Sequence, residues 1–237
     1  MLTTRVAALT AVITATALLA TLPSDAATSA PPATVAFDHP VPNPYFPIEP
    51  GTVSVLKGGE DGQVLTDRVT VTHSTRVIQG VTTTVVRDVL RRKDGSVAEK
   101  THDWYADDND GNVWYFGERT ATYDRHGHVT SREGSWEDGV DGAVRGIIMP
   151  ADPRPTKAYR QEFYPGHAED QAWIVQTRAH TDVPYGHLRH LVRSFEWTRL
   201  EKGVISEKLY ASGLGTVRER DLSGGNETFV LVSVTRP

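Results

Sequence analysis

Acidic side chains that could do chemistry are concentrated between residues 133 and 170. Two carboxyl groups in different environments can act as general acid and general base, which is the chemistry of many hydrolases and lyases. We take Glu137, Asp141 and Glu162 as the candidate catalytic residues. Spacing along the chain does not give their distances in the folded protein, so acid/base catalysis is one hypothesis among three.

A polar strand face suggests ligand binding as the second hypothesis. Alternation along the segment YRQEFY places Arg160, Glu162 and Tyr164 on one face. Glu196 lies in another predicted strand and could pair with Arg160. Inside a barrel, such groups form either a satisfied network or a pocket for a polar ligand. Trp136 completes the candidate ligand-binding set, because a tryptophan can stack on a ligand as well as pack in a core.

The segment DWYADDNDGNVWYFGE, residues 103–118, predicts a β-hairpin around an Asp-Gly turn. A two-residue turn would place Asp103 opposite Glu118, and two carboxylates in that position need a cation, an arginine or a shared proton. A three-residue loop with a glycine bulge would instead place Tyr105 opposite Tyr115. The sequence leaves both registers open.

The acidic tip of this hairpin suggests the third hypothesis, a calcium-stabilised interaction module with Asp108 and Asp110 as ligands. An EF-hand is rejected, because aligning Gly111 with the invariant glycine puts Ala106 and Gly117 at the first and last ligand positions. An irregular calcium turn remains open beside the simpler interpretation that Asp and Asn are ordinary turn residues. Calcium is the cofactor that this pattern suggests.

The start of the chain predicts export. Arg5 precedes an uncharged run of small and apolar residues, and Ser24-Asp25-Ala26 fits a cleavage site. Residues 1–26 therefore predict a secretory signal peptide rather than a membrane span, and we expect a secreted, extracellular protein with no transmembrane segment after cleavage.

Composition restricts the partners and the means of stabilisation. The 237 residues include no cysteine, so the fold must be held by its core without disulfides. The formal net charge is -5 and the basic residues are dispersed along the chain, which gives no sign of nucleic-acid binding.

The pattern of elements predicts one all-β domain. Residues 27–47 are rich in Pro, Ala and Thr and predict a linker, while residues 48–237 show short alternating runs separated by turn signals every 8–12 residues. About ten antiparallel strands are expected, in a lipocalin-like β-barrel or half-barrel, with a β-sandwich as the alternative. Residues 137–157 predict a long, ordered loop.

Three segments carry a resemblance: the hairpin of residues 103–118, WEDGVDGAVRGIIMPADP and YRQEFYPGHAED. Together they resemble a group of uncharacterised exported bacterial proteins. The segment YASGLGTVRE is similar to a strand turn in lipocalin-like and half-barrel envelope proteins. The resemblance implies a barrel outside the cytoplasm and assigns no catalytic residue. Many such proteins carry a lipid-modified cysteine after the leader, which this sequence lacks.

The leading hypothesis is a secreted β-barrel that binds a small molecule or a cell-envelope component in a polar cavity. A cavity lined by Arg160, Glu162 and Glu196 would support it. Convergence of the candidate carboxylates in an open cleft would instead support an exported enzyme.

Overall fold

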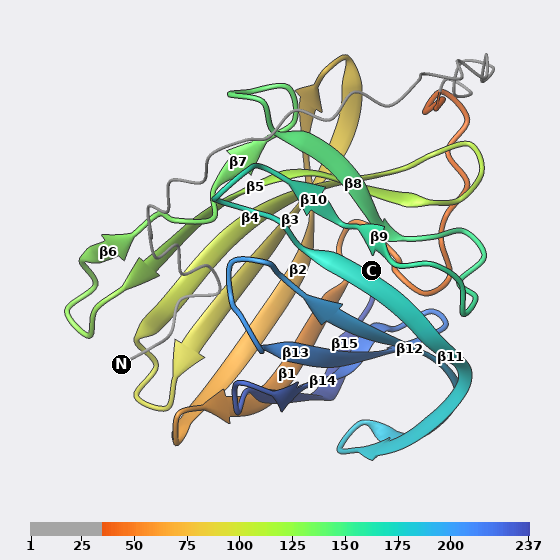
Figure 1. Ribbon diagram of the computed structural model, residues 1–237. Helices are drawn as coiled ribbons and strands as arrows, with labels where there is room; N and C mark the ends of the chain where they lie inside the picture. The colour runs from red at the N-terminus through yellow and green to blue at the C-terminus, as the bar shows by residue number, and fades with distance from the viewer. Residues whose placement is uncertain (1–34) are drawn as a thin grey trace, which may run out of the picture.

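The computed structural model describes residues 35–237, so the predicted signal peptide lies outside the described residues. The described part is all-β and contains no helix, and therefore no helix able to cross a membrane. It forms the following fifteen strands, shown in Figure 1: β1 (Val53–Glu60), β2 (Gln63–Ile78), β3 (Val81–Arg92), β4 (Val97–Asp107), β5 (Val113–Tyr123), β6 (Val129–Ser131), β7 (Trp136–Glu137), β8 (Val144–Met149), β9 (Tyr159–Arg160), β10 (Glu162–Phe163), β11 (Gln171–Val183), β12 (Gly186–Trp197), β13 (Ile205–Ala211), β14 (Gly215–Ser223) and β15 (Thr228–Thr235).

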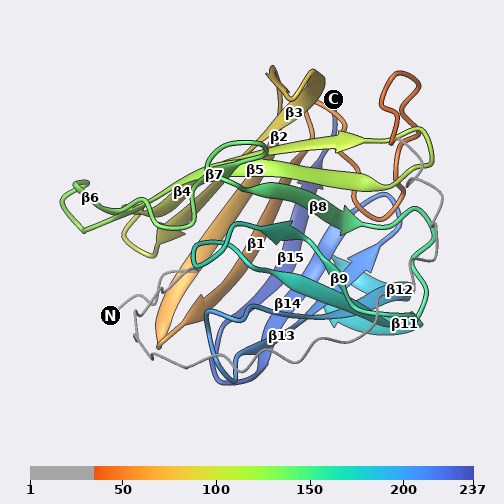
Figure 2. The ribbon, with the colours of Figure 1, turned by 45° about the horizontal axis from the view of Figure 1, so that its top comes forward.

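All strands belong to one antiparallel sheet in the order β10-β8-β5-β4-β3-β2-β1-β15-β14-β13-β12-β11-β9, with β6 and β7 attached to β5. The predicted barrel class is confirmed, although the strands outnumber the expected ten. Strands β2 to β8 form one half and β11 to β14 the other, and the β1–β15 pair joins them (Figure 2). The two halves face each other across a common interior.

The barrel is closed by one short segment of chain. Strand β9 pairs with β11, strand β10 pairs with β8, and Gln161 alone separates β9 from β10. The two edges of the sheet are therefore linked through adjacent residues, which covers edges that would otherwise be open to association. Gly146 on β8 packs closely against this segment. A Cβ at this position would lie only 2.5 Å from the Arg160 carbonyl oxygen.

The 103–118 hairpin combines features of both predicted registers. Tyr105 is opposite Tyr115 near the tip, and Asp103 is opposite Glu118 further along. Both pairings coexist because β5 bulges at Gly117, whose φ of 132° suits a glycine. At the tip, the Asp108 amide donates to the Asn112 carbonyl at 2.9 Å and Gly111 has a φ of 90°, so the three-residue loop of residues 109–111 is confirmed.

Two predicted elements differ from the structure. The expected loop of residues 137–157 contains β8, which pairs with β5. Its short GIIM run lacks the alternation that identifies a half-buried strand. The single strand expected from the YRQEFY segment is instead divided into β9 and β10 at Gln161. The alternation used to place Arg160 and Glu162 on one face therefore does not hold across that break.

The chain before β1 packs on the tip of the 103–118 hairpin. The Val41 amide donates to the Asp108 carbonyl at 3.0 Å, and Asn43 Nδ2 donates to the Gly111 carbonyl at 2.8 Å. Phe46 packs edge-on against Tyr105, with ring centroids 5.0 Å apart. This segment, which lies within the predicted linker, thus covers the tip side of the barrel.

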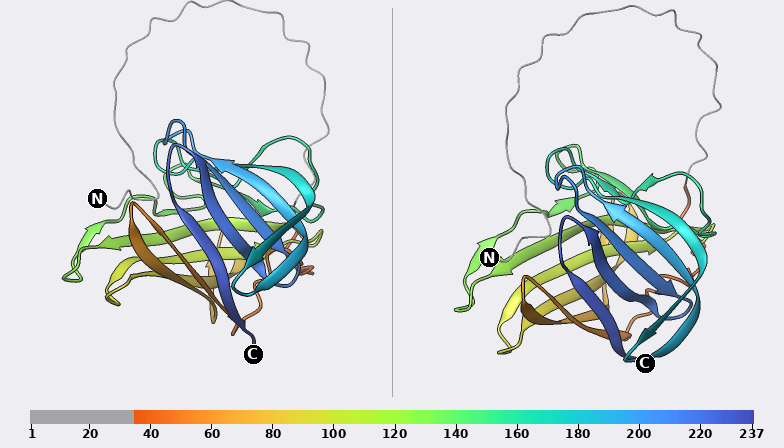
Figure 3. Two further views of the ribbon diagram at one scale, coloured as in Figure 1. Left: turned by 90° about the horizontal axis from the view of Figure 1, so that it is seen from below. Right: turned by 60° about the horizontal axis from the view of Figure 1, so that its bottom comes forward.

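The long β11–β12 hairpin curves around strands β13 to β15 (Figure 3). At its tip, the Tyr185 amide donates to the Leu231 carbonyl on β15 at 3.1 Å. A hydrophobic cluster joins this hairpin to the sheet through Ala179, Leu191 and Leu209. The fold thus has a core beneath the hairpin in addition to the one around Tyr115 and Trp136 inside the barrel.

Candidate functional site

The interior of the barrel holds a cavity of about 550 Å³ between the two halves of the sheet. Its wall carries fourteen carboxylate side chains but only two lysines, Lys202 and Lys208. The carboxylates are Glu60, Asp67, Asp88, Glu99, Asp103, Glu118, Glu133, Glu162, Asp170, Glu196, Glu201, Glu219, Asp221 and Glu227.

Strand alternation places these acids inside. Asp88, Asp103 and Glu118 line the cavity from three neighbouring strands, β3, β4 and β5. Their sequence neighbours Arg87, His102 and Arg119 are basic, and alternation directs these three side chains to the outer face. The same three strands are thus acidic towards the interior and basic towards the outside.

Asp103 and Glu118 face each other directly across the β4–β5 ladder. The Tyr115 hydroxyl donates to Asp103 Oδ1 at 2.7 Å. Burial, followed by repulsion from Asp103 and Glu162, raises the pKa of Glu118 well above its ordinary value. A proton on Glu118 therefore resolves the predicted conflict between the two carboxylates.

Glu162 lies deeper in the same cluster and is 5% exposed. Trp136 Nε1 donates to its Oε2 at 2.6 Å. Burial, and then the nearby Asp170, raises the pKa of Glu162 well above its ordinary value. Burial also raises the pKa of Asp170, to about 6, although Lys208 opposes the shift. A carboxyl group held neutral beside an ionised one can exchange a proton with a ligand, or release that proton to solvent when a cation binds.

Glu196 forms the centre of a second cluster on the opposite wall. It accepts hydrogen bonds from the Ser194 and Tyr210 hydroxyl groups at 2.7 and 2.8 Å. Lys208 Nζ lies 3.0 Å from Glu196 and 3.4 Å from Glu219. The internal ion pair predicted for Glu196 thus exists with Lys208 as the partner, and not with Arg160.

Gln161, at the closing point of the barrel, also lines the cavity. Its side chain is 3% exposed, and its Nε2 has no hydrogen-bond partner among the described residues. A buried amide donor without a partner is costly. Nε2 is therefore ready to donate to an acceptor on a bound molecule.

Two of the candidate ligand-binding residues lie away from the cavity. The Arg160 side chain is exposed, with its guanidinium 3.8 Å from the centre of the Phe163 ring. Tyr164 stacks on His167 in the turn after β10. The break at Gln161 separates Arg160 from the interior, whereas Tyr164 packs against the core around Tyr115 without lining the cavity. Glu162 and Glu196 line the cavity, and Trp136 supports Glu162.

The candidate catalytic residues are not brought together. Glu137 pairs with Arg76, outside the cavity, at 2.5 Å. Asp141 is exposed in a turn with a φ of 51°. Of the three, only Glu162 faces the interior. Trp136 of β7 points inward to Glu162, so alternation directs the next residue, Glu137, to the outer face.

The candidate calcium ligands form a self-contained loop. Asp108 accepts hydrogen bonds from the Asp110 and Asn112 amides, Asn112 Nδ2 and Trp114 Nε1, at 2.8–2.9 Å. Asp110 is exposed. Across residues 35–237, no three histidine, aspartate or glutamate side chains are placed to hold a metal ion. Calcium binding at the tip stays a prediction.

Sequence reasoning did not select several residues of the cavity wall. Asp103 and Glu118 were identified only as a conflict of register, and Gln161 and Lys208 were not selected at all. The available signal was the repeated acid–base alternation in β3, β4 and β5, which identifies an acidic face once one face is known to be enclosed.

Comparison with known proteins finds similar structures but identifies no family. No family model matches the chain, and no curated protein matches it. One similar solved structure is a candidate exported protein with a YmcC-like fold from Bacteroides fragilis, with 14% identity and a TM-score of 0.45, covering 81% of this chain and 99% of that one. Another is a candidate lipoprotein from Parabacteroides distasonis, with 13% identity and a TM-score of 0.44, covering 82% of this chain and 100% of that one.

Proposed function

We propose that this protein is an exported binding protein that holds a cationic, polar small molecule inside its barrel. The observation that carries this function is the cavity of about 550 Å³ with fourteen carboxylates and two lysines on its wall. Enclosed charges of one sign favour a ligand of the opposite sign. A cell-envelope component that carries such a cationic group fits the same description. Export itself rests on the predicted signal peptide.

The state of the acids supports a cation in particular. Without a ligand, Glu118 and Glu162 are held protonated because burial and neighbouring carboxylates disfavour their charges. A cation entering the cavity would favour the ionised forms, so these groups would release protons as it binds. Affinity for a ligand that stays cationic is therefore expected to rise as the pH rises through the raised pKa values of these groups, among which that of Asp170 is about 6.

The rest of the wall suggests that the ligand is more than a bare ion. Gln161 Nε2 needs a hydrogen-bond acceptor. Phe46 and Tyr105 add aromatic surface beside the acids. The carboxylates are spread over both halves of the sheet, which suits an organic amine that also carries hydroxyl or carbonyl oxygens.

Isothermal titration calorimetry with a glucosamine disaccharide and its neutral N-acetylated form tests this function. We expect the amine form to bind with proton release and the neutral form to bind at least about tenfold more weakly, because charge-assisted hydrogen bonds contribute about 1.5–3 kcal/mol. Glu118→Gln keeps the size of the protonated side chain but cannot ionise, so it should weaken amine binding by a similar factor.

Glu49→Gln is the matched control, because Glu49 is exposed and lies outside the cavity lining. It should bind like the unmodified protein. Equal affinity for the amine and the neutral sugar would contradict a cation-selective cavity. The binding function itself would be contradicted if neither sugar binds and spermidine, an amine without oxygen atoms, does not bind either.

A further inference from the structure

The outer face of the barrel carries a row of basic side chains that the proposed cavity function does not use. Arg87, His102 and Arg119 are direct neighbours across the β3–β4 and β4–β5 ladders. Adjacent strands are about 4.8 Å apart, so the three side chains leave the sheet within about 10 Å of one another. Lys100 lies on the same face of β4, two residues from His102.

These charges have no acidic partner. Arg87, Lys100 and Arg119 make no hydrogen bond or ion pair with any of residues 35–237, and the same holds for the ring of His102. Like charges directly opposite each other in a sheet are destabilising. Partial burial, followed by repulsion from Lys100, Arg119 and Arg87, lowers the pKa of His102. The row is thus a region of uncompensated positive potential.

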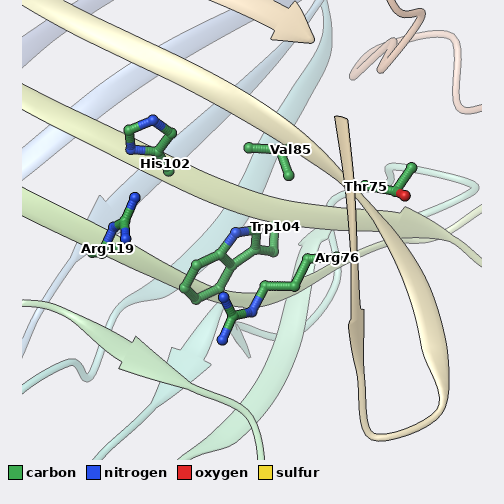
Figure 4. A pocket seen from close by; sticks show the side chains of 6 residues that line it. All are labelled: Thr75, Arg76, Val85, His102, Trp104 and Arg119. Carbon is green, nitrogen blue, oxygen red and sulfur yellow. The ribbon is translucent and has the colours of Figure 1, made fainter. Parts of the chain in front are cut away.

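A hollow of about 210 Å³ adjoins the row (Figure 4). Trp104, which is 6% exposed, lies in the middle of the lining, with Val85 and Thr75 to one side and His102 and Arg119 to the other. The Arg76 guanidinium lies 4.5 Å from the centre of the Trp104 ring and is held there by Glu137. The hollow therefore joins a small apolar surface to a group of donors.

We infer that this outer face is a second binding site, which takes a phosphate-bearing small molecule. Arg87, His102 and Arg119 hold the phosphate, whose charge of nearly two matches the row, and the Trp104 hollow takes the flat or apolar group that carries it. Guanidinium groups present paired donors that fit phosphate oxygens. A bound phosphate would also remove the repulsion within the row.

Two-dimensional NMR titration with phenyl phosphate, inorganic phosphate and phenol at constant ionic strength tests this site. We expect phenyl phosphate to shift the signals of the Trp104 indole and His102 and to raise the pKa of His102. Inorganic phosphate should bind at least about threefold more weakly, and phenol should cause no shift. Phenyl phosphate that leaves both signals unchanged would overturn the inference.

Arg119→Gln should weaken phenyl phosphate binding about tenfold or more and should maintain or raise the melting temperature, because it relieves the like-charge row. Arg178→Gln is the matched control, since Arg178 is an exposed arginine of β11 that makes no hydrogen bond or ion pair with the described residues. Equal binding by the two variants would overturn the inference. A melting temperature that is maintained or raised distinguishes loss of a contact from loss of the fold.

Discussion

At the scale of single residues, buried carboxyl groups are accommodated in two different ways. Inside the cavity, crowded carboxyl groups keep their protons, as Glu118 does beside Asp103. Under the β11–β12 hairpin, Glu207 is 1% exposed yet stays ionised, because Arg193, Arg218 and Arg220 surround it. Burial alone would raise the pKa of Glu207, but the contacts with these arginines hold it below its ordinary value.

Glu207→Gln should therefore destabilise the protein strongly. The substitution leaves three guanidinium groups around a neutral side chain, and breaking a buried ion pair by removing one partner costs about 3–5 kcal/mol. Chemical denaturation measures this loss, with the exposed Glu49→Gln as control. A loss below about 1 kcal/mol would show that water reaches the arginines and that the cluster contributes no more than surface pairs do.

At the scale of elements, the closing segment between β9 and β10 depends on Gly146. A Cβ at this position would lie 2.5–2.6 Å from backbone atoms of Arg160 and Gln161, which cannot move independently of the β9 and β10 ladders. We expect Gly146→Ala to cost about 1–3 kcal/mol, as overpacking does elsewhere. It should also speed amide hydrogen exchange at Gln161, which donates to the Asp170 carbonyl.

Gly80→Ala provides the control for this closure. Gly80 has a φ of 79° in the β2–β3 turn, and no atom lies within 4 Å of the added Cβ. It should therefore cost stability through local backbone strain, without faster exchange at Gln161. Faster exchange at Gln161 in both variants would show that general destabilisation, and not the Gly146 contact, opens the barrel.

The same segment shows why some elements resist sequence-based prediction. The hairpins with Asp-Gly turns were predicted because the turn and the flanking alternation are local signals. Strand β8 was missed because its partner, β5, lies about thirty residues earlier and its own run has no alternation. The prediction that Arg160 lies inside was wrong, because one residue of irregular backbone at Gln161 reverses the expected face. No sequence pattern marks this residue.

At the scale of the whole molecule, the acidic interior sets the pH dependence of stability. Glu118, Glu162 and Asp170 have pKa values raised by burial in the folded protein, and that of Asp107 is likewise raised to about 6. The folded state therefore binds more protons than the unfolded state between about pH 4 and the folded pKa values. Their stabilisation is complete below about pH 4 and is lost as the pH rises through the folded pKa values.

Without ligand, the protein should consequently be more stable at pH 5 than at pH 7.5, by on the order of 1 kcal/mol or about 2–4 °C in melting temperature. Glu207, whose pKa is lowered, loses its stabilisation only as the pH falls below about 4, so it does not alter this window. The pKa of His102 is also lowered, so its contribution is lost as the pH falls below about 6.5 and offsets part of the difference. Scanning calorimetry at the two pH values measures the difference. Glu118→Gln should reduce it and Glu49→Gln should not, whereas higher stability at pH 7.5 would contradict an interior held protonated.

The sequence by itself determined the absence of disulfides through its composition, and the all-β class, most hairpin turns and the alternation of acids and bases along strands, because these depend on neighbouring residues. The tertiary structure alone decided which alternating face is enclosed, which carboxylates from distant strands share one cavity, and where the sheet closes on itself. The physical reason is that a charge changes its pKa, and so its chemistry, only when other strands remove water and bring like charges near it.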